Sequence, residues 1–305
     1  MSNPTLISIV GPTAIGKTSL SVFLANYFKT EIISSDSRQF YKEMYIGTAV
    51  PSSDELNAVK HHFIQHRSIN DHYTVGDFEK DALSALKKIF REKKIAVMVG
   101  GSGLYINAVT TGLDYFPDVD PKIRESLNQR LKSEGLLNLQ NQLKEFDYEA
   151  YNTIAIENPH RVIRALEICI GTAKPYSSYL NKKKEKRFFK TISIGLNSDR
   201  ETLYDRINKR VDLMVEKGLI QEAKSLYGFK NLNALNTVGY KELFHFFDGE
   251  ISLDFAISEI KKHSRRFAKR QLTWFRKDKR IKWFDYKTNY DVIAEFISNE
   301  IKKTS

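Results

Sequence analysis

The sequence predicts an α/β fold in which helices cover a parallel β-sheet. Its first hundred residues alternate short apolar runs, at 6–10, 31–35 and 95–99, with stretches of helical spacing, at 18–28 and 76–94. Glycine directly follows the first and the third apolar run. Because strands separated by helices tend to pair in parallel and to be covered by those helices, we expect these five segments to form one layered domain.

The pattern changes after residue 111. Helical spacing continues through 123–134, 136–146 and 161–170 without a strand signal, and a strand pattern resumes only at 188–196. A helical segment that interrupts the α/β part explains this order, because strand signals return after it. A simple run of connecting helices is the alternative.

We therefore expect a helical insertion domain over 112–195, within a core made of 1–111 and 196–305. The rest of the core after residue 199 is predicted to be mostly helical. The predicted helices are at 201–227, 241–247, 253–275 and 292–301.

Positive charge is concentrated in two segments. The formal charge of the 305 residues is +11, and 261–282 holds eleven Lys or Arg against one acid, Asp278. A second segment, 182–190, holds six bases against Glu185. Such density predicts a polyanionic partner, with nucleic acid ahead of an anionic membrane surface. A solvated helix face neutralised by salt bridges is the alternative.

The composition excludes several classes of protein. Apolar residues make up 41% of the chain, and no window approaches 18 uninterrupted apolar residues, so no membrane span is expected. Cys169 is the single cysteine, which excludes an intrachain disulfide and a CxxC site. The N-terminal segment lacks the basic stretch and the long apolar stretch that are typical of a secretory signal. A cytoplasmic protein is expected.

One motif predicts a phosphate site. It follows the first predicted strand, precedes the first predicted helix and matches G-x-x-x-x-G-K-[ST]. In such a loop the backbone amides and the helix N-terminus surround a phosphate, the lysine adds a mobile charge and the last hydroxyl can bind Mg²⁺. This position disfavours a chance glycine turn and predicts a P-loop NTPase-like sheet. The loop comprises Gly11, Pro12, Thr13, Ala14, Ile15, Gly16, Lys17 and Thr18.

The strand predicted at 95–99 lacks the acid that nucleotide-hydrolysing machines usually carry at its end. It runs into Gly100-Gly101-Ser102-Gly103 instead. This weakens an ATPase or GTPase interpretation, although small-molecule kinases vary this element too. The site could hold a diphosphate leaving group without hydrolysing a nucleotide.

Asp36 follows the second predicted strand. The carboxyl ends of parallel strands line the ligand crevice, so Asp36 should face the phosphate loop and could accept a proton from an incoming nucleophile. An N-cap for the next turn is an equally good interpretation from spacing alone. Gln39, three residues later, could read an adenine edge.

Several motifs occur in a characteristic order from about residue 5 to 285. Together they make the chain resemble the bacterial tRNA dimethylallyltransferases, also called tRNA isopentenyltransferases. The motifs are Gly11 to Thr18, Asp36-Ser37-Arg38-Gln39 with Tyr41, Ile46-Gly47-Thr48-Ala49, His61-His62-Phe63, Gly100-Gly101-Ser102-Gly103-Leu104-Tyr105, Arg161 to Glu167, and Thr237 to Glu242.

The resemblance implies transfer of a dimethylallyl group from dimethylallyl diphosphate to the exocyclic amine of the adenosine 3′ of the anticodon, position 37 of tRNA, with release of diphosphate. It implies Mg²⁺ as cofactor and the anticodon stem-loop as partner, and we expect a monomer that does not bind membranes. From the residues alone, an ATP-dependent small-molecule kinase and a P-loop RNA-binding regulator remain alternatives.

The resemblance also implies roles for individual residues. The loop from Gly11 to Thr18 would bind the diphosphate, with Thr18 on Mg²⁺, and Asp36 would be the general base. Arg210, or failing that Arg206, matches an arginine that holds the diphosphate; Lys17, Thr18, Asp36 and Arg210 form the expected catalytic set. Ser102 stands where the family usually has Thr. The expected tRNA-binding residues are Asp36, Ser37, Arg38, Gln39, Ser102, His160, Arg161, Val162, Ile163 and Arg164.

The aromatic and histidine side chains carry weaker signals. Helical spacing favours core packing over base stacking for the aromatics of the basic segment, and Tyr105 and Tyr240 are also expected to pack. No Cys and no HExxH pattern accompanies the neighbouring histidines, so structural roles are expected for them rather than a metal site. The aromatic residues of the basic segment are Phe267, Trp274, Phe275 and Trp283, and the neighbouring histidines are His61, His62 and His66.

Overall fold

The structure is a computed structural model that describes residues 4–180 and 185–303. The chain forms two compact units, one made of 1–111 with 187–305 and the other of 112–186. The expected lysine cluster at 182–184 lies outside the described residues.

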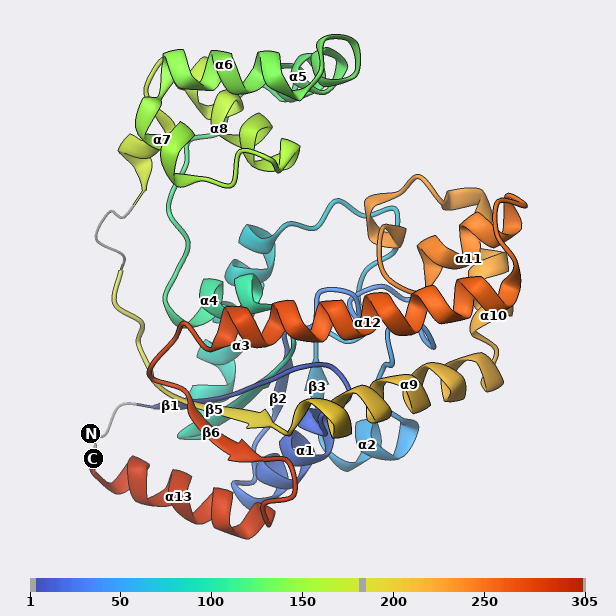
Figure 1. The fold of residues 1–305 in the computed structure, drawn as a ribbon. Helices are drawn as coiled ribbons and strands as arrows, with labels where there is room; N and C mark the ends of the chain where they lie inside the picture. Colours follow the sequence, from blue (N-terminus) through green and yellow to red (C-terminus); the bar gives the residue numbers. More distant parts are fainter. Residues whose placement is uncertain (1–3, 181–184, 304–305) are drawn as a thin grey trace. The chain divides into compact units, whose positions relative to one another are not determined.

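The larger unit contains a six-stranded sheet in the order β3-β2-β4-β1-β5-β6, and every neighbouring pair runs parallel (Figure 1). The prediction of a parallel sheet flanked by helices is confirmed. Two strands were missed: β3 has only two residues, and β6 follows the end of the basic helix. The strands are β1 (Thr5–Val10), β2 (Ile32–Ser34), β3 (His61–His62), β4 (Ile95–Val99), β5 (Lys190–Asn197) and β6 (Lys282–Asp285).

Helices cover both faces of this sheet, with α1 and α13 on one side and α3, α4 and α12 on the other (Figure 1). One face packs residues such as Ile7 and Ile9 of β1 against Leu20 of α1 and Ile297 of α13. The helices of this unit are α1 (Lys17–Tyr27), α2 (Ser53–Ala58), α3 (Val75–Glu92), α4 (Gly103–Thr110), α9 (Arg200–Glu216), α10 (Leu219–Ser225), α11 (Tyr240–Phe247), α12 (Leu253–Phe275) and α13 (Tyr290–Lys303), with short 3-10 turns at Tyr227–Phe229 and Asn233–Leu235.

The opposite face of the sheet turns Leu6 and Val10 toward Phe78 of α3, Ile106 of α4 and Phe275 of α12. The strands are apolar on both sides, as a doubly covered parallel sheet requires. All strands therefore end at one edge of the sheet, where the loops after β1, β2 and β4 come together.

A third apolar cluster joins α10, α11 and the first half of α12 to Tyr41 and Met44, which lie between β2 and α2. The helix predicted over 201–227 is here two helices. Gly218 separates them with a φ of +102°, a left-handed conformation that ends the regular helix. The turn lets α10 fold onto the third cluster.

The smaller unit is all helical among its described residues and has its own core, which includes Leu127, Leu139 and Val162. The expected boundary at residue 195 is wrong, because Lys190 to Gly195 pair with β1 and therefore belong to the larger unit. Its elements are α5 (Pro121–Glu134), α6 (Leu136–Phe146), α7 (Tyr148–Thr153), α8 (Pro159–Thr172) and a 3-10 turn at Tyr176–Tyr179.

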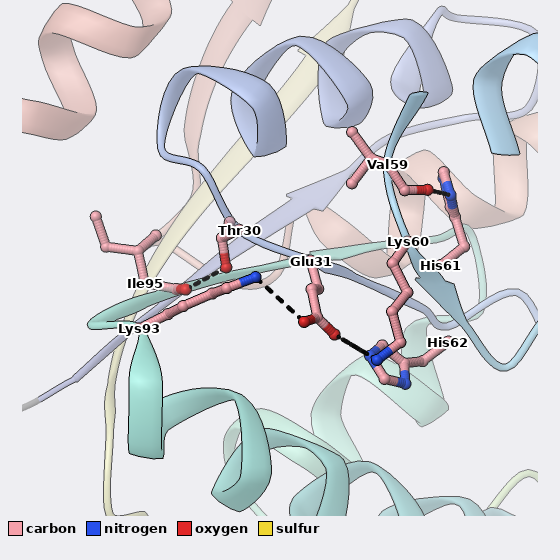
Figure 2. Close-up of polar contacts among 8 residues, drawn as sticks. All are labelled: Thr30, Glu31, Val59, Lys60, His61, His62, Lys93 and Ile95. Atoms are coloured by element: carbon pink, nitrogen blue, oxygen red, sulfur yellow. Dashed lines mark hydrogen bonds and ion pairs between the residues drawn. The ribbon is translucent and has the colours of Figure 1, made fainter. Parts of the chain in front are cut away.

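Charged residues tie the amino ends of three strands together (Figure 2). The carboxylate of Glu31, just before β2, contacts His62 Nε2 at 2.7 Å, Lys93 Nζ at 3.1 Å and Lys60 Nζ at 3.2 Å. Burial raises the pKa of Glu31, but these hydrogen bonds outweigh it and leave the pKa at about 2. Thr30 adds a bond to the carbonyl of Ile95. The cluster lies at the amino edge of the sheet, opposite the carboxyl edge where the loops after β1, β2 and β4 come together.

None of the helices in the described part of the chain has both the length and the apolar character needed to cross a membrane.

Candidate functional site

Two cavities open at the carboxyl edge of the sheet. The smaller, about 610 Å³, is lined by the loop after β1, the loop after β2 and α9. The larger, about 880 Å³, is lined by the loops after β2 and β4, by α12 and by residues 236–239 before α11. The two cavities share a set of lining residues, so they adjoin. The shared residues are Thr13, Asp36, Arg210, Met214, Phe267 and Gln271.

The predicted phosphate loop closes the carboxyl end of β1 and runs into α1. Gly16 precedes the helix at a φ of +104°, and α1 begins at Lys17. Lys17 Nζ donates a 2.7 Å hydrogen bond to the carbonyl of Pro12. Burial lowers the pKa of Lys17 to about 8; Asp36 partly offsets this and Arg210 adds to it. An anion bound here would be attracted by this ammonium group, whose charge Asp36 neutralises only in part.

Arg210 and Arg206 lie one turn apart on α9 and have different environments. Arg210 lines both cavities, and burial lowers its pKa, which Asp36 opposes. Arg206 lines only the smaller cavity; its Nε donates to the carbonyl of Ala14 at 2.8 Å, and its guanidinium lies 4.9 Å from the ring centroid of Tyr286. Arg206 thus holds the phosphate loop, whereas Arg210 is the arginine at the junction of the cavities.

Asp36 lies at that junction as well. One oxygen, Oδ1, accepts the backbone N–H of Arg38 at 3.2 Å, so the carboxylate caps the turn after β2 while it faces both cavities. Ser102 fixes this turn to the loop after β4, because its Oγ accepts the N–H of Ser37 and lies 3.1 Å from the Ser37 hydroxyl. The loop of Ser102 therefore helps to position the carboxylate.

Gln271 was not predicted. It is 6% exposed, comes from α12 and bridges two site loops: its Oε1 accepts the N–H of Thr13 at 2.9 Å, and its Nε2 donates to the carbonyl of Gly101 at 3.0 Å. The sequence held one signal that could have found it: Gln271 stands on the core face of the predicted helix at 253–275. A buried amide requires polar partners, so this position predicts contacts to nearby loops.

Arg38 and Gln39 are occupied by contacts within the protein. Arg38 donates to the carbonyls of Asn233 and Ala234 at 2.9 and 2.8 Å. Gln39 is buried, and its Nε2 donates to the carbonyls of Thr48 and Ala49. Both side chains hold loops around the cavities, so we do not propose the base contact that was expected of Gln39.

Glu222 of α10 anchors the loop that lies between the two cavities. Its carboxylate accepts the N–H groups of Tyr45, Ile46 and Gly47 at 3.0, 2.7 and 2.9 Å, and the hydroxyl of Tyr240 at 2.6 Å. Ile46 lines the smaller cavity and Gly47 the larger. Tyr240 is fully buried, as expected.

The basic segment divides into two halves. Lys261 pairs with Asp212, Lys262 with Glu259, and Arg265 bonds to Asn208. Within the described residues, the lysines and arginines from 266 to 279 have no acidic partner. Arg280, the next basic residue, pairs with Asp278. The unpaired bases are Arg266, Lys269, Arg270, Arg276, Lys277 and Lys279, and all are exposed. Only the first half fits the salt-bridged alternative.

The expectation that the aromatics of this segment pack in the core is half wrong. Phe275 is buried and Trp283 packs partly against the same core. Phe267 and Trp274 are each 39% exposed and line the larger cavity. Helical spacing reports that residues share a face but not whether that face meets a core or a cavity.

The predicted RNA-binding residues of the smaller unit differ among themselves. His160 and Arg161 are exposed at the start of α8. Val162 and Ile163 are buried in the core of the unit, so their side chains pack there and we propose no RNA contact for them. Arg164 donates to the buried carboxylate of Glu167 at 2.8 Å.

No cluster of three or more His, Cys, Asp or Glu side chains in residues 4–180 and 185–303 could hold a metal ion by itself. His61 bonds to the carbonyl of Val59, His62 to Glu31, and His66 lies among aromatic rings with its pKa lowered to about 4 by burial. The hydroxyl of Thr18 and the carboxylate of Asp36, both on the smaller cavity beside the phosphate loop, are oxygens that could bind a cation.

A phosphate loop at the end of a central parallel strand, with a carboxylate on the next loop, defines an enzyme of the P-loop α/β class. A family model described as IPP transferase matches residues 39–278. The chain belongs to this family of prenyl-transferring enzymes. It is 65% identical over 301 residues to the tRNA dimethylallyltransferase of Christiangramia forsetii, covering 99% of both chains, and 54% identical over 305 residues to that of Flavobacterium johnsoniae, covering 98% of this chain and 99% of the relative.

Solved structures agree with this assignment. The full-length tRNA isopentenylpyrophosphate transferase of Bacillus halodurans superposes with a TM-score of 0.74 at 39% identity, covering 99% of this chain and 98% of that one. A eukaryotic dimethylallyltransferase, captured in crystallographic snapshots acting on tRNA, superposes with a TM-score of 0.79 at 29% identity, covering 98% of this chain and 80% of that one.

Proposed function

We propose that the protein transfers a dimethylallyl group from dimethylallyl diphosphate to the exocyclic amine of the adenosine 3′ of the anticodon in tRNA, releasing diphosphate. The relatives named tRNA dimethylallyltransferase support this activity. The observation that carries it is the pair of adjoining cavities with Asp36 and Arg210 on their shared wall. A donor in one cavity and a base in the other would meet beside these two side chains.

The smaller cavity suits the diphosphate of the donor. As the allylic C–O bond breaks, negative charge grows on the leaving diphosphate, and fixed positive groups around it lower the barrier. Lys17, Arg210 and the start of α1 supply such groups. Apolar residues on the same cavity, among them Val50 and Leu213, would contact the hydrocarbon tail and keep water from it.

Asp36 would act on the amine. An aromatic exocyclic amine is a poor nucleophile, and a carboxylate that accepts its N–H proton as the new N–C bond forms removes the positive charge that would otherwise build up on nitrogen. Asp36 is held for this by the Arg38 N–H and by the Ser37–Ser102 contact. The proton leaves the amine for the carboxylate, and the diphosphate carries away the electrons of the broken bond.

Mg²⁺ would be held by few protein groups. This ion usually keeps several waters and is bound through one or two side-chain oxygens together with substrate phosphates. The Thr18 hydroxyl has no hydrogen-bond partner within the described residues and lies with Asp36 on the smaller cavity, so the donor set fits. When bound, the ion would neutralise charge on the leaving diphosphate.

The RNA would approach over the larger cavity. Its target base must be drawn out of the stack to reach Asp36, which costs a few kcal/mol and favours unpaired loops over duplexes. The lysine and arginine side chains between Arg266 and Lys279 that have no acidic partner provide the positive charge that RNA phosphates require. His160 and Arg161 offer exposed polar and charged groups on the smaller unit.

Mass analysis of nucleosides tests the proposal. Transfer RNA incubated with the protein, Mg²⁺ and dimethylallyl diphosphate should yield an adenosine heavier by one dimethylallyl group, and Asp36→Ala should abolish this product while the donor still binds. Asp291→Asn, an exposed carboxylate on α13, is the control and should leave the yield unchanged. Absence of the product, or ATP-dependent phosphorylation of a small molecule without RNA, would contradict the proposal.

A further inference from the structure

The turn between β6 and α13 lies beside the start of α9. The strand β6 pairs in parallel with β5 (Figure 1), and the backbone N–H of Tyr286, directly after β6, donates to the carbonyl of Asn197 at the end of β5 at 2.8 Å. The N–H of Lys287 donates to Oδ1 of Asp285 at 2.9 Å, which closes the turn. Because α9 begins shortly after β5, Tyr286 is fixed next to the helix that carries Arg206.

The ring of Tyr286 lies against the guanidinium of Arg206. The guanidinium carbon is 4.9 Å from the ring centroid, a distance at which a cation is attracted to an aromatic face. Lys287 is a more distant neighbour of the ring, with its exposed Nζ 5.7 Å from the centroid. Within residues 4–180 and 185–303, Arg206 has no acidic partner. Its charged group is therefore held by the Tyr286 ring and by the carbonyl of Ala14.

Arg206 passes this support to the phosphate loop. Its Nε donates to the carbonyl of Ala14 at 2.8 Å. Ala14 has a φ of +63°, a left-handed conformation that a residue with a Cβ atom keeps only where its surroundings enforce it. Under the proposed function the diphosphate lies against the N–H groups that follow Ala14, so a shift of this residue would displace them.

Tyr290, the first residue of α13, brings the same segment close to the phosphate loop at a second point. A Cβ atom on Gly16 would lie 4.0 Å from the Tyr290 hydroxyl. The Tyr290 ring packs against Phe23 of α1, with the ring centroids 5.4 Å apart. Burial raises the pKa of Tyr290 and the charge of Arg206 opposes this, so the guanidinium lies near this ring too. The segment thus approaches the loop at Gly16 as well as through Arg206.

We propose that Tyr286 is a positioning residue of the diphosphate site: its ring holds Arg206, and Arg206 holds the phosphate loop at Ala14 in the conformation that binds the anion. Tyr286 lines neither cavity, so it acts only through Arg206. The inference rests on the part of the proposed function that assigns the diphosphate to this loop. It extends the site to a residue that follows the edge strand of the sheet.

Binding of inorganic diphosphate tests this role without turnover. Calorimetry in the presence of Mg²⁺ compares the unaltered protein with Tyr286→Leu, which keeps an apolar side chain but removes the ring. We expect the Kd to rise about twofold to thirtyfold, the range that one cation–π contact contributes. Tyr286→Phe keeps the ring and should bind as the unaltered protein does. An unchanged Kd in Tyr286→Leu, or an equal loss in Tyr286→Phe, would overturn the inference.

Phe284→Leu is the matched control. Phe284 lies on β6, and its ring packs against Phe296 of α13 with centroids 5.5 Å apart, so this variant loosens the same segment at a contact that does not involve Arg206. Both leucine variants should lower the thermal midpoint, but only Tyr286→Leu should raise the Kd. If Phe284→Leu raises the Kd as much, the segment contributes stability alone and the positioning role is overturned.

A double-mutant cycle identifies the partner of the ring. In Arg206→Gln the cation is absent, so adding Tyr286→Leu should weaken diphosphate binding no further. Hydrogen exchange at residues 13–16 gives a second readout, since these amides should exchange faster in Tyr286→Leu and at the unaltered rate in Phe284→Leu. A full additional loss of affinity in the double variant would contradict a role through Arg206.

The possible failures are distinguishable. If the protein binds diphosphate but does not prenylate tRNA, the proposed reaction falls, while the comparison of Kd values still decides the role of Tyr286. If it prenylates tRNA, Tyr286→Leu should raise the KM for dimethylallyl diphosphate and leave the KM for tRNA unchanged. Prenylation with both KM values unaltered in this variant would overturn the inference alone. If the unaltered protein does not bind diphosphate, both fall.

Discussion

The backbone N–H of Thr13 donates a 2.9 Å hydrogen bond to the side chain of Gln271, 258 positions later in the chain. The other end of the same amide reaches the carbonyl of Gly101 at 3.0 Å. A single side chain of α12 thus joins the phosphate loop to the loop that carries Ser102. The N–H of Thr13 is therefore used within the protein, so under the proposed function the later residues of the loop would hold the diphosphate.

We predict that Gln271→Leu lowers both stability and kcat. Leucine is of similar size, but it leaves a buried N–H and a buried carbonyl without partners, which costs about 1–3 kcal/mol for each group. The thermal midpoint should fall by several degrees, and kcat should fall by more than tenfold because Asp36 and the phosphate loop lose their common support. Thr273→Ala, an exposed change on the same helix, serves as control. Unchanged kcat in Gln271→Leu would contradict a positioning role.

The affinity for a diphosphate should weaken as the pH rises through about 8. Burial lowers the pKa of Lys17 to about 8, so the ammonium group that attracts the anion is lost above that pH. The bound anion favours the charged form, so the loss in the complex occurs at a higher pH than in the free protein. Calorimetry with a non-reacting alkyl diphosphate between pH 7 and 9.5 measures this. Lys17→Arg stays charged and should show little slope; an equal slope in that variant would exclude Lys17 as its cause.

Glu222→Gln should loosen the loop at 45–47. The carboxylate accepts four hydrogen bonds, three of them from consecutive backbone N–H groups, and an amide can accept from only one of its two ends. We expect a loss of about 3 kcal/mol in the free energy of unfolding, measured in urea, and faster proteolysis near this loop. Glu216→Gln, exposed at the end of α9, is the matched control and should behave as the unaltered protein.

Glu31 should stabilise the fold in a pH-dependent way. Its folded pKa of about 2 lies below the unfolded value of 4.5, so its contribution is complete above pH 4.5 and is lost as the pH falls toward 2. The difference in unfolding free energy between the unaltered protein and Glu31→Gln should be on the order of 3 kcal/mol at pH 6 and should shrink below pH 4.5. Glu92→Gln, an exposed acid at the end of α3, controls for net charge. A difference that stays constant from pH 6 to pH 3.5 would contradict this assignment.

Contiguous motifs explain why much of the fold and part of the site could be predicted. The phosphate loop carries its strand, its turn and its helix start within 18 residues, and Asp36 follows from the next strand end. The resemblance was needed to single out Arg210 or Arg206, and sequence alone could not tell their surroundings apart, because two arginines one turn apart on α9 share a face in sequence but not a set of partners. Which of them holds the diphosphate stays a prediction.

Residues that act across the chain could not be found this way. Gln271 and Glu222 hold loops 170 or more positions away, and no local pattern records such a contact. The strands β3 and β6 are too short to show a period of two. The burial of Val162 and Ile163 was within reach, because helical spacing separates them from Arg161 and Arg164, which lie three residues apart on one face.

The helical unit at 112–186 folds around leucines and valines of its own rather than around the sheet. The apolar residues of this core are distinct from those that pack on either face of the sheet, so substitutions among them leave the sheet's own core unaltered. For protein engineering, residues 111 and 187 mark the two joints at which a foreign module could be spliced in without replacing residues of the sheet unit.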